Sequence, residues 1–185
     1  MTFKNNSMAI PIMIKRIKIS DEYRTEIIFS FRDVMHNKQL LILREKIIYE
    51  FDELISKIKN IIDGKKPSKV SRKNLWEIGH TILKVRKKIA EKYGVDITNI
   101  IQAVAEELGL SESSIQYMVQ FSVMIPKSKV KEDISWGKYQ EAIKLVDRTD
   151  FNKCINLIEN KQLKTTKEIR EYVRQKNRER RRKNE

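Results

Sequence analysis

The apolar residues between Leu40 and Ile62 recur at positions i, i+3, i+4 and i+7, and this pattern limits the fold more than any other feature of the chain. Such spacing predicts an amphipathic helix with one apolar stripe. Asn37 is suited to cap the helix and Gly64 to end it, because asparagine accepts backbone N–H groups and glycine adopts positive φ without strain. We expect the stripe to pack within its own domain. A homodimer through Leu40 to Ile62 is the alternative.

A period of two residues precedes this helix. Apolar and polar side chains alternate from Tyr23 to Arg32, as in a half-buried strand. The isoleucines upstream of Tyr23 stand at even positions before Lys15 and at odd positions after Arg16. One continuous strand with all of them on one face therefore requires a bulge near Lys15 and Arg16. We therefore expect a β-hairpin that turns at residues 20–22, within an N-terminal arm of residues 1–37. Because an isolated hairpin is marginal in water, it must pack on the helices or pair with another subunit.

The remainder of the chain has mainly helical periodicity. Thr165 and Glu168 have the spacing of a capping box that opens the last helix. Before it, we expect helices over residues 70–92, 97–108, 112–125, 136–146 and 151–159. The predicted fold is mainly α, a multi-helix domain with an N-terminal hairpin. Its parts are the arm, a long helix with a basic linker (residues 38–66), a helical domain (67–173) and a basic C-terminal tail (174–185).

Residues 101–121 have the packing pattern of a helix-turn-helix. The first helix needs a small residue where the second crosses it, and Ala105 supplies one. The turn needs positive φ four residues later, where Gly109 stands, and Ser111 is suited to cap the second helix. The residues expected to anchor the second helix on the first are Ile115 and Met118. The alternative is a helix-turn-helix that forms only core or binds protein.

The outward residues of the second helix are the candidates for reading bases in a major groove. Glutamine amides pair with adenine through one donor and one acceptor, and hydroxyls contact bases or phosphates. These candidates are Ser113, Gln116, Tyr117 and Gln120. Residues 110–121 contain no lysine or arginine, so phosphate contacts must come from flanking elements. The candidates are Arg72, Lys73, Lys84, Lys87, Lys88, Lys127, Lys129, Lys131, Arg178, Arg180, Arg181 and Arg182, with solvated helix faces and a solubilising tail as the alternative interpretation.

Composition narrows the classes of function. The chain has 39 Lys and Arg against 25 Asp and Glu, a net charge of +14, which favours a polyanionic partner. A run of about 18 apolar residues is absent from the sequence, so we expect no membrane span and a cytoplasmic protein. One cysteine and two histidines are too few for a zinc site. Neither a catalytic triad nor a phosphate-binding loop is apparent, so we expect no enzyme activity, metal or cofactor.

Trp136 and Tyr139 stand beside basic residues, an arrangement that also suits stacking on unpaired bases. Their helical spacing with Ile143 favours packing in the core instead.

Five motifs in this order resemble the N-terminal domain of the YhcG-like proteins over residues 41–176. They are Leu75-Trp76-Glu77-Ile78-Gly79-His80, Tyr93-Gly94, Leu108-Gly109-Leu110-Ser111, Ile134-Ser135-Trp136-Gly137-Lys138-Tyr139 and Lys164-Thr165-Thr166-Lys167-Glu168-Ile169. The resemblance implies a helical DNA-binding module. Members of that family usually carry a PD-(D/E)XK nuclease domain after this module, and no Asp followed by a strand-borne Glu-x-Lys is found here. A nuclease is therefore implied as a separate partner.

Two functions follow as hypotheses. In the first, the protein binds duplex DNA with sequence specificity and in preference to single strands, and it acts as a regulator or a mobile-element factor. The alternative is an interaction module that docks a nuclease or toxin partner through the Leu40 to Ile62 helix.

Overall fold

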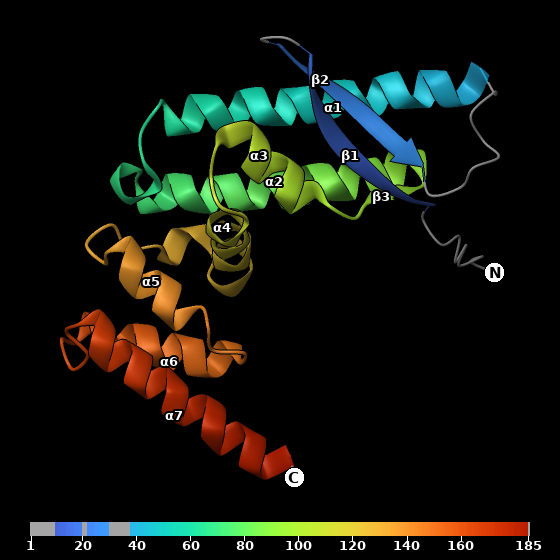
Figure 1. Cartoon of the computed structure of the whole chain (residues 1–185). Coiled ribbons are helices and arrows are strands. Elements are labelled where there is room, and N and C mark those ends of the chain that lie inside the picture. Colours follow the sequence, from blue (N-terminus) through green and yellow to red (C-terminus); the bar gives the residue numbers. More distant parts are fainter. Residues whose placement is uncertain (1–9, 20–21, 30–37, 185) are drawn as a thin grey trace. The chain divides into compact units, whose positions relative to one another are not determined.

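The computed structural model describes residues 10–19, 22–29 and 38–184, which form a mainly helical fold with one small sheet (Figure 1). The predicted mainly α class with N-terminal strands is confirmed. Short 3-10 helices at Pro67–Lys69 and Lys127–Lys129 join some of the main elements. The elements are β1 (Ile10–Ile19), β2 (Glu22–Phe29), α1 (Lys38–Ile62), α2 (Arg72–Tyr93), β3 (Val95–Ile97), α3 (Ile100–Leu108), α4 (Glu112–Met124), α5 (Trp136–Ala142), α6 (Arg148–Glu159) and α7 (Thr166–Asn184).

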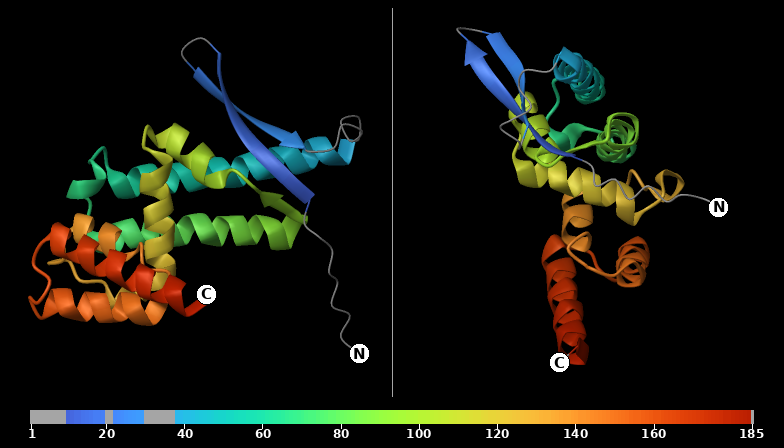
Figure 2. Two further views of the ribbon diagram at one scale, coloured as in Figure 1. Left: turned by 60° about the horizontal axis from the view of Figure 1, so that its bottom comes forward. Right: turned by 90° about the vertical axis from the view of Figure 1, so that its right-hand side faces the viewer.

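The chain divides into two compact units that differ from the predicted domains. Unit 1 comprises Met1–Asp63 and Thr81–Gln116, and unit 2 comprises Gly64–His80 and Tyr117–Glu185. Helices α2 and α4 therefore each contribute residues to both units. The ribbon views show the helices and strands from two further directions (Figure 2). Periodicity along a sequence does not reveal such a division, because both helices continue through it without a break.

Strands β1 and β2 form the predicted antiparallel hairpin in unit 1. Their register runs without interruption from Ile12 opposite Phe29 to Ile19 opposite Glu22. The expected bulge near Lys15 and Arg16 is therefore wrong. Both residues keep regular partners, Glu26 and Thr25 of β2. The buried face of the hairpin carries Ile12, Ile14, Thr25 and Ile27. Part of the predicted alternation and the Asn37 cap lie outside the described residues.

A third strand, β3, was not predicted. It pairs in parallel with β1, from Ile10 opposite Val95 to Ile12 opposite Ile97, and gives the sheet the order β2-β1-β3. The helix expected over residues 97–108 accordingly begins at Ile100. Three residues are too few to show a period of two, and the strand forms by pairing with β1, with Val95 and Ile97 buried at 1% and 0% exposure.

The side chain of Asn99 extends the pairing of β1 beyond β3. Its Nδ2 donates to the carbonyl oxygen of Ile14 at 2.7 Å, and its Oδ1 accepts the amide of Ile14 at 2.9 Å. In Asn99→Asp the donor becomes an oxygen that faces this carbonyl, so we expect a loss of about 1–3 kcal/mol in the free energy of unfolding of unit 1. Hydrogen exchange of the β1 amides measures this. Unchanged protection at Ile14 would contradict the role of the amide.

Helix α1 buries its apolar stripe inside unit 1, as expected. Ile47, Phe51, Leu54 and Ile58 are at most 1% exposed. The helix ends before Gly64, where φ is +65°, which confirms the predicted stop. The stripe that was the alternative dimer surface is therefore buried within unit 1. The exposed apolar side chains of this helix are Leu41, Ile42 and Tyr49.

The core of unit 2 is organised around aromatic side chains. The ring of Phe121 in α4 packs against Trp136 and Tyr139 of α5, at centroid distances of 5.4 and 4.6 Å. Trp136 is 5% exposed and Tyr139 is fully buried, so their predicted core role is confirmed. The Tyr139 hydroxyl accepts the backbone N–H of Lys131 at 3.0 Å, and burial raises the pKa of Tyr139 to about 12.

Two helices of unit 2 differ in length from their predictions. Helix α5 ends at Ala142 instead of residue 146, whereas α7 runs from Thr166 to Asn184 and includes the residues predicted as a tail. The capping box is confirmed, because Glu168 N–H donates to Thr165 Oγ1 at 3.2 Å and Glu168 Oε2 accepts the Thr165 amide at 3.1 Å. The former tail residues continue α7 because arginine, lysine, glutamate and glutamine are good helix formers. Cations near the C-terminus of a helix also interact favourably with the negative end of its dipole.

Candidate nucleic-acid interface

A tight turn joins α3 and α4, and its geometry matches the sequence pattern. Gly109 has φ of +61°, and the amide of Leu110 donates to the carbonyl oxygen of Ala105 at 2.9 Å, which closes the end of α3. The hydroxyl of Ser111 accepts the amide of Ser114 at 3.2 Å and so caps α4. Ala105 is 1% exposed, as the predicted close packing at this position requires.

The four base-reading candidates share one side of α4. Ser113 is exposed, while Gln116, Tyr117 and Gln120 are half-buried. They stand at i, i+3, i+4 and i+7, the spacing of a single helical stripe. The opposite side of α4 is buried and carries Ile115, Met118 and Phe121, each at 0% exposure. The outward stripe is therefore uncharged and partly accessible, and Val123 extends it at 58% exposure.

The net positive charge belongs almost entirely to unit 2. By sequence, unit 1 has 16 Lys and Arg against 14 Asp and Glu, and unit 2 has 23 against 11. The net charges are +2 and +12, which together make the +14 of the chain. The excess of positive charge is therefore a property of unit 2. Sequence position alone does not show this, because the two units alternate along the chain.

The phosphate-contact candidates of α2 in unit 1 are mostly neutralised. Lys88 Nζ lies 2.5 Å from a carboxylate oxygen of Glu50, which is 6% exposed. Lys87 pairs with Glu91 one turn later at 3.6 Å. Lys84 is exposed and has no ion-pair partner among the described residues. Of the three, only Lys88 thus joins α2 to another element of unit 1, whereas the side chains of Lys84 and Lys87 are exposed to solvent.

The backbone at the start of α2, in unit 2, is bound by a carboxylate from after α4. The amides of Arg72 and Lys73 donate to the two carboxylate oxygens of Glu132, at 2.7 and 3.0 Å. The guanidinium of Arg72 donates to the carbonyl oxygens of Ser68 and Val70. This carboxylate satisfies amides that a helix N-terminus leaves unpaired and interacts favourably with the helix dipole. The guanidinium of Arg72 is therefore used within the fold, whereas the Lys73 side chain is exposed and has no ion-pair partner among the described residues.

The remaining candidates of unit 2 fall into two groups. Lys127 lies 2.5 Å from Glu77 and its ammonium stands 5.7 Å from the centre of the Trp76 ring. Arg180 lies 3.4 Å from Asp147. These two cations form the paired group. The second group has no ion pair within the part of the chain that the structure describes, and its members are Lys129, Lys131, Arg178, Arg181 and Arg182.

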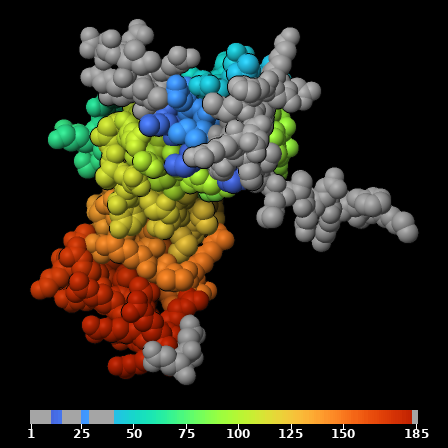
Figure 3. Space-filling view, turned by 45° about the vertical axis from the view of Figure 1, so that its right-hand side comes forward, coloured from blue at the N-terminus to red at the C-terminus, as the bar shows by residue number. Residues whose placement is uncertain are grey.

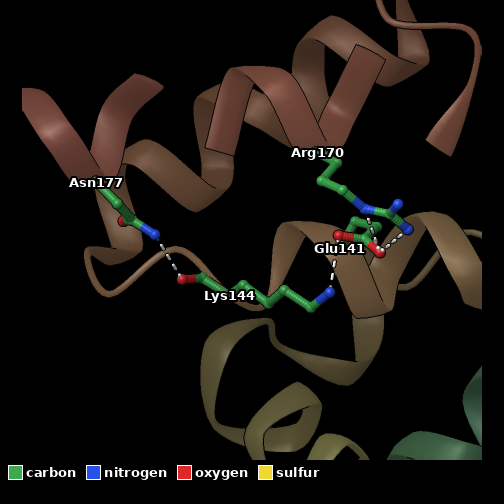
Figure 4. A network of polar contacts seen from close by, with 4 residues as sticks. All are labelled: Glu141, Lys144, Arg170 and Asn177. Carbon is green, nitrogen blue, oxygen red and sulfur yellow. Dashed lines mark hydrogen bonds and ion pairs between the residues drawn. The ribbon is translucent and has the colours of Figure 1, made fainter. Parts of the chain in front are cut away.

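Helices α5 and α7 are joined by a buried carboxylate (Figure 4). Glu141, at 7% exposure, accepts Nη2 of Arg170 at 2.8 Å through one oxygen and Nζ of Lys144 at 2.8 Å through the other. Asn177 Nδ2 donates to the backbone oxygen of Lys144 at 3.2 Å. Burial raises the pKa of Glu141, but the hydrogen bonds from Arg170 and Lys144 outweigh burial and hold the pKa below its usual value.

Other kinds of site find little support in the described residues. Their His, Cys, Asp and Glu side chains form no group of three suited to a metal ion. Cys154 is fully buried, and burial raises the pKa of its thiol to about 12, so it is not a reactive nucleophile. No described helix has both the length and the apolarity needed to cross a membrane.

A comparison with protein-family models, curated proteins and solved structures yields no match to this chain.

Proposed function

We propose that this chain binds duplex DNA with sequence preference, and that α3 and α4 act as a helix-turn-helix in which α4 reads base edges. The observation that carries the proposal is the uncharged, partly exposed stripe on α4 in a chain whose net charge is concentrated in one unit. Amide and hydroxyl groups suit base edges, whereas phosphate binding requires cations. The two roles therefore fall to different residues, as they do in many DNA-binding proteins.

The resemblance to the YhcG-like proteins supports the same proposal. It implies a DNA-binding module that works beside a nuclease, which would make this chain a targeting subunit, a regulator or a mobile-element factor. Co-purification of a nuclease or toxin, together with negligible duplex affinity, would favour the interaction module instead. Such a module would use the exposed residues of α1, namely Leu41, Ile42 and Tyr49, since its main stripe is buried.

Selection of bound duplexes from a random pool, at two salt concentrations, tests the proposal. We expect an enriched sequence, and an affinity that falls on the order of a thousandfold between about 50 and 200 mM salt for six or more phosphate contacts. Failure to enrich any sequence, or to bind duplex at low salt, would refute it.

The double variant Gln116→Ala, Tyr117→Ala tests the reading helix. We expect the preference for the selected duplex over an unrelated one to fall about 10- to 100-fold, with non-specific affinity retained, because base contacts carry discrimination. A matched control removes the same residue types from exposed positions outside α4, Gln102 in α3 and Tyr49 in α1. Fluorescence anisotropy measures both affinities. If the α4 variant kept full preference, α4 would not be the reading helix.

A further inference from the structure

One face of α7 carries arginines that the fold itself does not use. Arg174, Arg178 and Arg182 stand four residues apart, so they form a row along the helix with steps of about 6 Å. All three are exposed, and none has an ion-pair partner in the described part of the chain. We propose that this row contacts the phosphate backbone of duplex DNA, an assignment that rests on the DNA binding proposed above.

The opposite face of α7 is fastened to the rest of unit 2. Ile169 and Val173 are buried at 0% and 4% exposure. Asn177 is held by the Lys144 carbonyl, and Arg180 by Asp147 at 3.4 Å. These contacts extend over three turns, so the orientation of the helix within its unit is set and the arginine row faces away from the core. The space-filling view shows α7 as the red surface of the molecule (Figure 3).

The guanidinium groups of Arg174, Arg178 and Arg182, which mark the outer face of α7, remain available to a ligand. Glu171 and Glu179 line the same surface as the arginines. Glu179 accepts hydrogen bonds from Gln175 at 3.0 Å and Lys176 at 2.8 Å within the helix. Helix α7 as a whole has nine Lys and Arg against three Glu, which is half of the net +12 of unit 2. Arg174 was predicted only as part of the basic tail, and its place in this row is decided by where α7 packs.

Side-chain chemistry favours phosphate over other anionic partners. Guanidinium groups bind phosphate oxygens through two parallel hydrogen bonds, and the row consists of arginines only. A helix that lies on a membrane needs an exposed apolar face. In α7 the apolar side chains Ile169 and Val173 are buried, so the outer face offers nothing to insert into lipid. A rigid row of cations fits a regular array of phosphates.

Two double variants of the full chain separate this face from the net charge of the helix. The outer-face variant is Arg174→Gln, Arg178→Gln, and the matched inner-face variant is Lys176→Gln, Arg180→Gln. Both remove two positive charges from α7 and keep a good helix former. The measurement is the slope of log affinity against log salt concentration, with a short duplex of arbitrary sequence as the probe.

We expect the outer-face variant to flatten the slope by about 1.8 and to lose roughly 50-fold in affinity near 100 mM salt, while the inner-face variant retains most of both. Equal losses in the two variants, or a full slope in the outer-face variant, would overturn the assignment to this face and leave the proposed function standing. Absence of duplex binding by the unmodified protein would instead refute the proposed function. Binding to phosphatidylserine vesicles that depends on the same arginines, without duplex binding, would overturn both.

Discussion

Replacement of Gly79 by alanine is expected to destabilise unit 2 by about 3 kcal/mol or more. At this position a Cβ atom would lie 2.0 Å from the carbonyl oxygen of Met118 and 2.8 Å from the amide nitrogen of Val119. Both are backbone atoms of α4, so no side chain can rotate away and the two helices must separate. Alanine is otherwise the better helix former by about 1 kcal/mol, so a loss of stability in this variant would have to come from the close contact with α4.

Gly137→Ala is the matched control in the same unit. A Cβ there would meet only the Thr166 methyl at 3.7 Å, an ordinary contact, so we expect a result between no change and a gain of about 1 kcal/mol. Urea unfolding followed by tryptophan fluorescence measures both variants, because the two tryptophans, Trp76 and Trp136, lie in unit 2. Equal stability of the two alanine variants would show that α2 and α4 do not approach as closely as described.

The second large effect is expected at Glu141. The Glu141→Gln variant loses the charge that Arg170 and Lys144 neutralise, and we expect a loss of about 2 kcal/mol in the free energy of unfolding at neutral pH. The folded-state pKa of Glu141 lies below its usual value, so its stabilisation is present above the unfolded-state pKa. It is lost as the pH falls through the folded-state pKa.

The stability difference between the original chain and Glu141→Gln should therefore shrink as the pH falls below about 4.5. Glu171→Gln serves as the control, since it removes an exposed carboxylate of α7 that forms no ion pair among the described residues, and its stability should not change. Urea unfolding across pH, again by fluorescence, decides the matter. A difference that persists unchanged in acid would show that Glu141 acts through packing rather than charge.

Short-range features of this chain were predictable from sequence. The Gly109 turn, the Ser111 cap and the Thr165 capping box each depend on residues a few positions apart, and all three are found as expected. The stripe of α1 was predictable for a similar reason, because burial of one face repeats every turn. Likewise, the absence of lysine and arginine from α4 follows directly from its composition.

Features that depend on distant residues were not predictable. Strand β3 owes its conformation to β1, Lys88 pairs with Glu50 of α1, and the backbone amides of Arg72 and Lys73 at the start of α2 donate to Glu132 after α4. Lys88 was among the predicted phosphate contacts. The sequence around this lysine does not show the carboxylate that the fold brings to it from another helix.

The sequence by itself thus determined which segments are helices, where most of them end and that the chain is strongly basic. These properties arise from local propensity, from capping and from composition, each of which acts within a few residues. Only the tertiary structure decided how the charge is divided between the units, which arginines of α7 face outward and why position 79 must be glycine. Those properties depend on which elements approach one another, and close packing between segments far apart in sequence sets that approach.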